Sequence, residues 1–178
     1  VPEVASLIGP LREMISVLQA NRDIPQIEVA VGEIRTAAGI SNVVALVIRH
    51  LKPFSGDDLQ LLTDFGKQHA IHLYLQPSGA GSVQKLFPES TSDRLQYFLP
   101  EFDLTLNFHP MDFTQVNAEI NHQMVSQAIE LLGLSKDDTV LDLFCGLGNF
   151  TLAIAGQCKQ VIGIESSDAM VHRGAENA

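Results

Sequence analysis

The stretch that decides the fold runs from Val140 to Thr151 and reads VLDLFCGLGNFT. An apolar run that contains Asp142 is followed by Gly146-Leu-Gly148 and then by a second apolar run. This order predicts a β-strand, a tight glycine turn and a helix. A glycine carries no Cβ, so a ligand can approach the backbone of such a turn closely. The stretch therefore predicts a ligand site at the carboxyl end of a strand.

A second acidic residue follows at the end of the next expected strand, over residues 160–165. Glu165 comes 19 residues after Gly146. In nucleotide-binding β-α-β units, an acid at an offset of about 20 residues accepts hydrogen bonds from ribose hydroxyls. The turn and the acid together predict a nucleoside site in the opening β-α-β of a Rossmann-like, doubly wound sheet.

Two residues bear on which nucleoside fits this site. Thr151 stands where a dinucleotide-binding turn has its third glycine. Asp142 adds negative charge four residues before Gly146, which would repel a pyrophosphate and suits a ligand with cationic groups. S-adenosylmethionine carries a sulfonium and an amino group. The residues therefore favour S-adenosylmethionine and leave a dinucleotide as the alternative.

Upstream, residues 1–110 are expected to form an α+β unit, in which no motif carries chemistry. The run 43–48 is almost wholly apolar, so this strand is expected to be covered on both faces. The other expected elements are a helix from Pro10, a strand at 27–31, a helix from Ser55, a strand at 71–75 and a strand pair at 95–99 and 104–108.

Residues 111–178 are expected to form the start of the Rossmann-like domain. A long helix is predicted over 113–133, with Asp112 and Gln115 spaced as a capping box. Its expected apolar stripe is Val116, Ile120, Met124 and Ala128. The chain begins with Val1 and ends at Ala178 inside an expected helix, so we expect the domain to be truncated.

The glycine stretch, together with Asp112-Phe-Thr-Gln-Val-Asn117, resembles the RNA uracil-C5 methyltransferase family. The likeness is greatest to the bacterial 23S ribosomal RNA enzymes with an iron–sulfur cluster, and it covers most of the chain, more weakly upstream. The resemblance implies that Gln115, Phe144, Asn149 and Glu165 contact S-adenosylmethionine, and that Phe113 lies near the target base. Asp142, Gly146 and Gly148 complete the expected cofactor site.

The resemblance also implies what the chain lacks. In the family, the cysteine that adds to C6 of uracil and the general base lie downstream of the second strand, and an RNA-binding barrel and the [4Fe-4S] ligands lie upstream. The parent is then expected to methylate C5 of a uridine in 23S rRNA, with transfer RNA as the alternative substrate. This chain is expected to carry no catalytic residue, and the parent is expected to bind RNA through missing domains.

Two function classes compete with this interpretation. One is a nucleotide-dependent oxidoreductase, and the other is a non-catalytic interaction module that retains the glycine loop. Some site residues also have plainer roles: Gln115 in a capping box, Asn149 as a helix cap, and Asp142 as an acceptor for loop amides.

The remaining titratable residues predict no metal site. Cys145 and Cys158 form no CxxC pair, and both are expected to be structural. His69 and His72 are three residues apart with no carboxylate or cysteine beside them, so they are expected to be ordinary histidines.

Charge and hydropathy limit the partners. The formal net charge of −10 is unlike that of a nucleic-acid binder, which usually presents a basic face. No apolar run approaches the ~20 residues that span a bilayer, and no signal peptide opens the chain, so a cytoplasmic protein without membrane contact is expected. An open sheet edge in a half domain predicts self-association and weak cofactor affinity.

Overall fold

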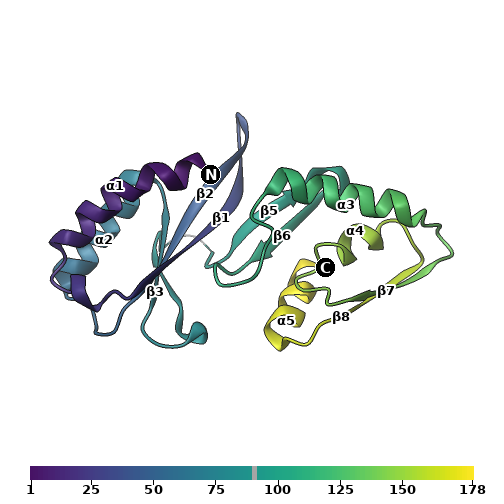
Figure 1. Cartoon of the computed structure of the whole chain (residues 1–178). Coiled ribbons are helices and arrows are strands. Elements are labelled where there is room, and N and C mark those ends of the chain that lie inside the picture. Colours follow the sequence, from purple (N-terminus) through teal and green to yellow (C-terminus); the bar gives the residue numbers. More distant parts are fainter. Residues whose placement is uncertain (90–91) are drawn as a thin grey trace. The chain divides into compact units, whose positions relative to one another are not determined.

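The computed structural model describes residues 1–89 and 92–178, and it divides into two compact units, Val1–Leu95 and Gln96–Ala178. Figure 1 shows the elements of each unit. The division falls earlier in the chain than the boundary expected near residue 110, because β6 (Leu104–Phe108) packs with α5 (Asp168–Asn177) at the end of the chain. The architecture is the mixed α/β type that the sequence predicts.

The first unit is a four-stranded sheet of order β1-β2-β3-β4. β1 pairs antiparallel with β2, β2 pairs parallel with β3, and β3 pairs antiparallel with β4. The strands are β1 (Gln26–Thr36), β2 (Gly39–Arg49), β3 (His72–Gln76) and β4 (Gln84–Phe87). Short 3-10 turns lie at Asn21–Asp23 and Ala80–Ser82.

Two helices of this unit, α1 (Pro2–Val17) and α2 (Gly56–His69), lie together against the sheet (Figure 1). Their side chains share one core with alternate residues of β2, and the residues of β2 in between are buried as well. The expectation that this strand is covered on both faces is confirmed. The buried run is Val44, Ala45, Leu46, Val47 and Ile48.

Of the two helix starts predicted in this unit, that of α2 is correct and that of α1 is wrong. Ser55 caps α2 as expected, since its Oγ accepts a hydrogen bond from the backbone N–H of Asp58 at 3.1 Å. α1 begins at Pro2, and Pro10 lies inside it, although a helix start near Pro10 is expected. Leu7 and Met14, one on each side of Pro10, are both buried in the core. This packing outweighs the local cost of an interior proline.

The second unit contains the predicted β-α-β. β5 (Leu95–Leu99) and β6 form a two-stranded sheet, with a 3-10 turn at Pro100–Phe102 between them. β7 and β8 are parallel, in a register that runs from Thr139↔Gln160 to Leu143↔Ile164. The elements that follow β6 are α3 (Ala118–Leu132), β7 (Thr139–Leu143), α4 (Thr151–Ala155), β8 (Gln160–Ile164) and α5.

The predicted start and apolar face of α3 are wrong. The helix begins after Asn117, whose Oδ1 accepts a hydrogen bond from the backbone N–H of Ile120 at 3.1 Å. Asparagine is among the best N-cap residues, so the helix starts there rather than near residue 113. The expected stripe is displaced as well: Val116 is 91% exposed, whereas Asn121 and Val125 are the buried residues of α3.

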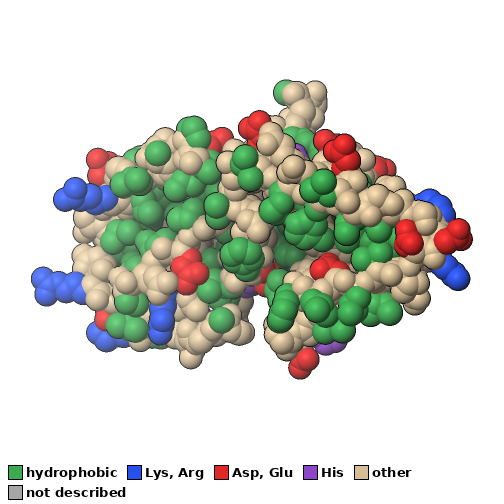
Figure 2. All heavy atoms as spheres, turned by 45° about the vertical axis from the view of Figure 1, so that its right-hand side comes forward, with side chains coloured by type: hydrophobic (Ala, Val, Ile, Leu, Met, Phe, Trp, Pro, Cys, Tyr) green, Lys and Arg blue, Asp and Glu red, His purple; other side chains and the backbone are tan. Residues whose placement is uncertain are grey.

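One face of the β7–β8 sheet remains exposed. Leu141 lies beside Ile162 and Leu143 beside Ile164, and all four are between 46% and 56% exposed. Figure 2 shows hydrophobic side chains gathered on the surface of the second unit. Among the described residues, no helix is long and apolar enough to cross a membrane.

Candidate functional site

The glycine turn between β7 and α4 has an unusual backbone. Phe144, Gly146 and Gly148 all have positive φ, at 62°, 57° and 101°. The turn is held by two backbone hydrogen bonds: Cys145 donates to Ile164 at 3.1 Å, and Gly148 donates to Cys145 at 3.0 Å. Positive φ suits glycine but strains a phenylalanine. Phe144 is also 83% exposed, so this strain presents an aromatic ring at the surface beside the turn.

Glu165, at the end of β8, is joined directly to this turn. Its Oε2 accepts a hydrogen bond from the backbone N–H of Gly146 at 3.1 Å. Its Oε1 accepts from the backbone N–H groups of Ser166 and Ser167 at 2.7 and 3.0 Å. These N–H groups, that of Ser167 most of all, lower the pKa of Glu165 below its ordinary value. The carboxylate is therefore kept ionised, and within residues 1–89 and 92–178 only Gly146 donates to Oε2, which can accept from a further donor.

Asp142 makes a contact that the sequence reasoning did not foresee. Its Oδ2 accepts a hydrogen bond from the Thr151 hydroxyl at 2.5 Å, which ties the end of β7 to the first residue of α4. Burial first, and the charge of Asp142 second, raise the pKa of the neighbouring Cys145 thiol. Nucleophilic cysteines need the opposite shift. Cys145 is thus poorly suited to attack a substrate.

Gly163 of β8 was missed by the sequence analysis. A Cβ at this position would lie 2.8 Å from Cys145 Sγ and 3.3 Å from Thr151 Oγ1. In a dinucleotide-binding turn, the third glycine permits close helix–strand packing. Here Thr151 occupies that position, and Gly163 on the adjacent strand provides the space. A lone glycine inside an apolar strand is a recognisable signal for such close approach.

Asn149 is held in a network rather than capping α4. Its Oδ1 accepts hydrogen bonds from the Tyr97 hydroxyl at 2.9 Å and from Asn121 Nδ2 at 3.0 Å. Its Nδ2 donates to Asn121 Oδ1 at 2.9 Å. The residue before α4 is Phe150, which makes no side-chain cap bond. The cap role considered for Asn149 is therefore not what the structure shows.

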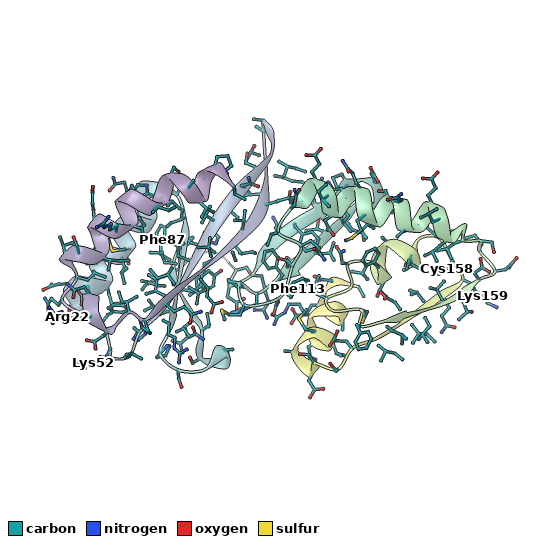
Figure 3. The ribbon with its side chains drawn as sticks, viewed as in Figure 1. Arg22, Lys52, Phe87, Phe113, Cys158 and Lys159 are labelled. Carbon is teal, nitrogen blue, oxygen red and sulfur yellow. The ribbon has the colours of Figure 1, made fainter. Side chains whose placement is uncertain are left out.

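Asp112 fixes the segment that leads into α3. Its Oδ2 lies 2.6 Å from Arg173 Nε of α5 and accepts a hydrogen bond from the backbone N–H of His109 at 2.6 Å. Among the described residues Asp112 and Gln115 form no capping box, because α3 begins after Asn117 and Asp112 pairs with His109 and Arg173 instead. Gln115 and Phe113 are exposed, Phe113 at 78% (labelled in Figure 3). Among the described residues, no hydrogen bond joins Gln115 to the glycine turn.

α5 is tied to the turn by a residue that sequence reasoning also missed. Asn177 Oδ1 accepts from the backbone N–H of Asn107 at 2.8 Å, and its Nδ2 donates to the carbonyls of Asn107 at 3.1 Å and Leu147 at 3.2 Å. One amide thus joins α5, β6 and the glycine turn. Only the folded chain brings these positions together, so no local sequence signal marks them.

His69, His72 and Cys158 form no metal site in the described part of the chain, and His72 Nδ1 is buried there without a hydrogen-bond partner. The ring of His69 lies 4.5 Å from that of Phe65, and burial lowers the pKa of His72 to about 4, with Lys85 adding to the shift. Cys158 is buried. In the part of the chain that the structure describes, no group of three or more histidine, cysteine or acidic residues could hold a metal ion.

The parallel β7-α4-β8 unit, with its glycine turn and the acid after the second strand, has the Rossmann-like fold of S-adenosylmethionine-dependent methyltransferases. The Pyrococcus abyssi tRNA (uracil-54, C5)-methyltransferase, solved in complex with S-adenosyl-L-homocysteine, matches 77% of this chain and 33% of its own, with a TM-score of 0.55 and 16% identity. The Methanocaldococcus jannaschii tRNA m1G37 methyltransferase matches 98% of this chain and 47% of its own, with a TM-score of 0.52 and 12% identity. At such identities the likeness shows the fold alone.

Sequence comparison defines the family. Residues 13–178 match the tRNA (uracil-5-)-methyltransferase family model, and the chain belongs to this family. Relatives from Hahella chejuensis and Alcanivorax borkumensis are 46% and 47% identical over 178 residues, and both are named 23S rRNA (uracil(1939)-C(5))-methyltransferase RlmD. The match covers all of this chain, which spans 38% of the length of each relative.

Proposed function

We propose that this chain is the cofactor-binding part of an S-adenosylmethionine-dependent methyltransferase that modifies C5 of a uridine in 23S rRNA. The observation that carries the proposal is the hydrogen bond between Glu165 and Gly146, which joins the ends of two parallel strands beside the strained turn. The relatives' names support the reaction and the RNA. In this proposal the methyltransferase domain begins near residue 111 and follows an α+β central domain over residues 1–110.

The residues at the turn fit the cofactor. The remaining acceptor capacity of Glu165 Oε2 suits a ribose hydroxyl, and the exposed ring of Phe144 provides an apolar surface at the glycine turn. Asp142 and Glu165 give the site negative charge, which suits the cationic sulfonium and amino group of the cofactor. Gly148 completes the turn, since its φ of 101° would strain any residue with a side chain. We assign Gln115 to a contact with the cofactor and Phe113 to a contact with the target base.

When bound, S-adenosylmethionine supplies an electrophilic methyl group on its sulfonium. The chain's own residues bind and orient that donor: Glu165 accepts from the ribose, and the backbone of the turn fixes where the nucleoside lies. The raised pKa of Cys145 makes it unsuited to act as the nucleophile. We therefore assign the attacking cysteine and the general base to the part of the relatives that this chain does not span.

The charge distribution supports RNA binding through other parts of the parent. Within Gln96–Ala178, three lysines and arginines stand against eleven aspartates and glutamates. An acidic surface repels phosphate, so the affinity for RNA is assigned to missing domains. A [4Fe-4S] cluster needs four cysteine ligands, and the chain has two cysteines, so its ligands are also assigned outside. A cytoplasmic location follows from the ribosomal RNA substrate.

Transfer RNA is the second candidate substrate, because the description of the matching family model names tRNA. The full-length parent, incubated with tritiated S-adenosylmethionine and either 23S rRNA or bulk tRNA, distinguishes the two. Methyl incorporation at a uridine of 23S rRNA is expected. Incorporation into tRNA alone would overturn the assignment of the RNA.

Titration calorimetry with S-adenosylhomocysteine and with NADH tests the cofactor. Binding of S-adenosylhomocysteine is expected, and Glu165→Gln is expected to weaken it about tenfold through loss of charged hydrogen bonds. Asp168→Asn is a matched control, since it removes an exposed acid of α5 that does not touch the turn. Binding of NADH without S-adenosylhomocysteine would favour an oxidoreductase and reject the proposal.

A further inference from the structure

The amide network around Asn149 joins three separate elements of the second unit. Asn121 comes from α3, Tyr97 from β5, and Asn149 from the turn that precedes α4. Asn121 is 3% exposed. The two asparagines exchange two hydrogen bonds, at 3.0 and 2.9 Å, and therefore form a closed amide pair.

This pair fixes the direction in which Asn149 presents its donors. An asparagine amide has two acceptor lone pairs and two N–H donors. Asn149 uses both lone pairs, on Tyr97 and Asn121, and one N–H, on Asn121. Within the described residues one N–H is left over. Burial raises the pKa of Tyr97, so its hydroxyl remains a donor and holds the amide in this orientation.

A purely structural role explains this arrangement poorly. Buried amides and hydroxyls contribute little net stability when paired and destabilise strongly when left unpaired. An apolar contact such as that of Val125, one turn further along α3, would join the helix to its surroundings with less risk. What the polar network adds is a fixed orientation for an amide that adjoins the glycine turn.

We infer that Asn121 and Tyr97 are positioning residues that hold Asn149 so that its remaining N–H can donate to an acceptor of the bound cofactor. The inference rests on the proposed function and extends it to two residues outside the glycine turn. Neither residue touches the ligand. Both act through Asn149, which makes their effects on binding depend on its presence.

A double-mutant cycle on this chain tests the dependence. The variants Asn121→Ala, Asn149→Ala and the double variant are titrated with S-adenosylhomocysteine, and folding is monitored by thermal melting. Each single variant is expected to weaken binding about three- to tenfold, the range for one lost hydrogen bond. The double variant is expected to bind no more weakly than Asn149→Ala. Tyr97→Phe, which removes only the hydroxyl, is expected to act in the same direction.

His122→Ala is the matched control. His122 lies beside Asn121 on α3 and contacts the backbone carbonyl of Phe98 through Nε2 at 2.7 Å, without touching Asn149. It is expected to lower the melting temperature and leave binding by the folded protein unchanged. A loss of binding equal to that of Asn121→Ala would indicate a general effect of loosening α3 and overturn the inference.

The remaining outcomes separate the inference from the proposed function. If the unmodified chain binds S-adenosylhomocysteine and Asn121→Ala binds equally well, the inference alone fails. Additive losses in the double variant would also overturn it, because Asn121 would then act independently of Asn149. If the unmodified chain does not bind the probe at millimolar concentration, the proposed function fails and the inference fails with it.

Discussion

Arg173 of α5 and Asp112 form a largely buried ion pair, with Nε and Oδ2 2.6 Å apart and side chains 11% and 9% exposed. The pair anchors the start of the segment that carries Phe113 and Gln115. Both side chains are exposed; Phe113 is assigned to the target base and Gln115 to the cofactor. The position of that segment therefore depends on a contact with the last helix of the chain.

Breaking this pair is expected to destabilise the second unit. Arg173→Ala leaves the Asp112 carboxylate buried without its cation, a change that costs about 3 kcal/mol. Urea denaturation followed by circular dichroism measures the loss. His172→Ala, an exposed neighbour on the same helix, is the control and is expected to change stability little. Equal stabilities of the two variants would show that the pair contributes nothing.

The lowered pKa of Glu165 predicts a pH dependence with a defined sign. Its folded-state pKa lies below the ordinary value of 4.5 for a glutamate, so its contribution to stability is present above that pH and is lost as the pH falls through the folded pKa. The melting temperature of the unmodified chain is expected to fall more steeply below pH 4.5 than that of Glu165→Gln. Parallel pH profiles for the two proteins would contradict the assignment.

The close contact at Gly163 predicts a substitution effect with a partial rescue. Gly163→Ala places a Cβ 2.8 Å from Cys145 Sγ, and such overpacking costs about 1–3 kcal/mol. Cys145→Ala removes the sulfur and is expected to restore part of the loss in the double variant, measured by denaturation. Gly156→Ala is the control, since its Cβ would meet nothing nearer than 3.8 Å. No rescue would mean that another contact sets the requirement for glycine.

The exposed face of β7–β8 predicts self-association of this chain. Parallel strands are normally covered on both faces, and Leu141, Leu143, Ile162 and Ile164 leave an apolar surface on one. Sedimentation velocity is expected to show concentration-dependent dimers or larger species. Leu143→Lys is expected to reduce them, and Val29→Lys, an exposed position in the first unit, is not. A monomer at all concentrations would refute this prediction.

The sequence predicted the parts of the fold and site that are local. The glycine turn, the second strand and the acid that meets Gly146 follow from spacing alone, because a β-α-β unit brings the ends of its strands to one edge. The cap at Ser55 is equally local. In each case, residues close in the chain determine the geometry.

The errors and omissions arise from tertiary contacts. Asp112 matched a capping box in spacing, but it pairs with Arg173, a residue 61 positions away in the sequence that spacing cannot reveal. The start of α1 was misplaced because the packing of Leu7 and Met14 outweighs Pro10. Asn121 lies one residue away from the stripe expected for α3, so its partnership with Asn149 was not anticipated.

The most direct test of the central claim is the structure of this chain bound to S-adenosylhomocysteine. We predict ribose hydroxyls within hydrogen-bond distance of Glu165 Oε2, with the nucleoside lying against the turn that contains Gly146. A complex in which the nucleoside binds elsewhere, with Glu165 contacting only the protein, would contradict the account.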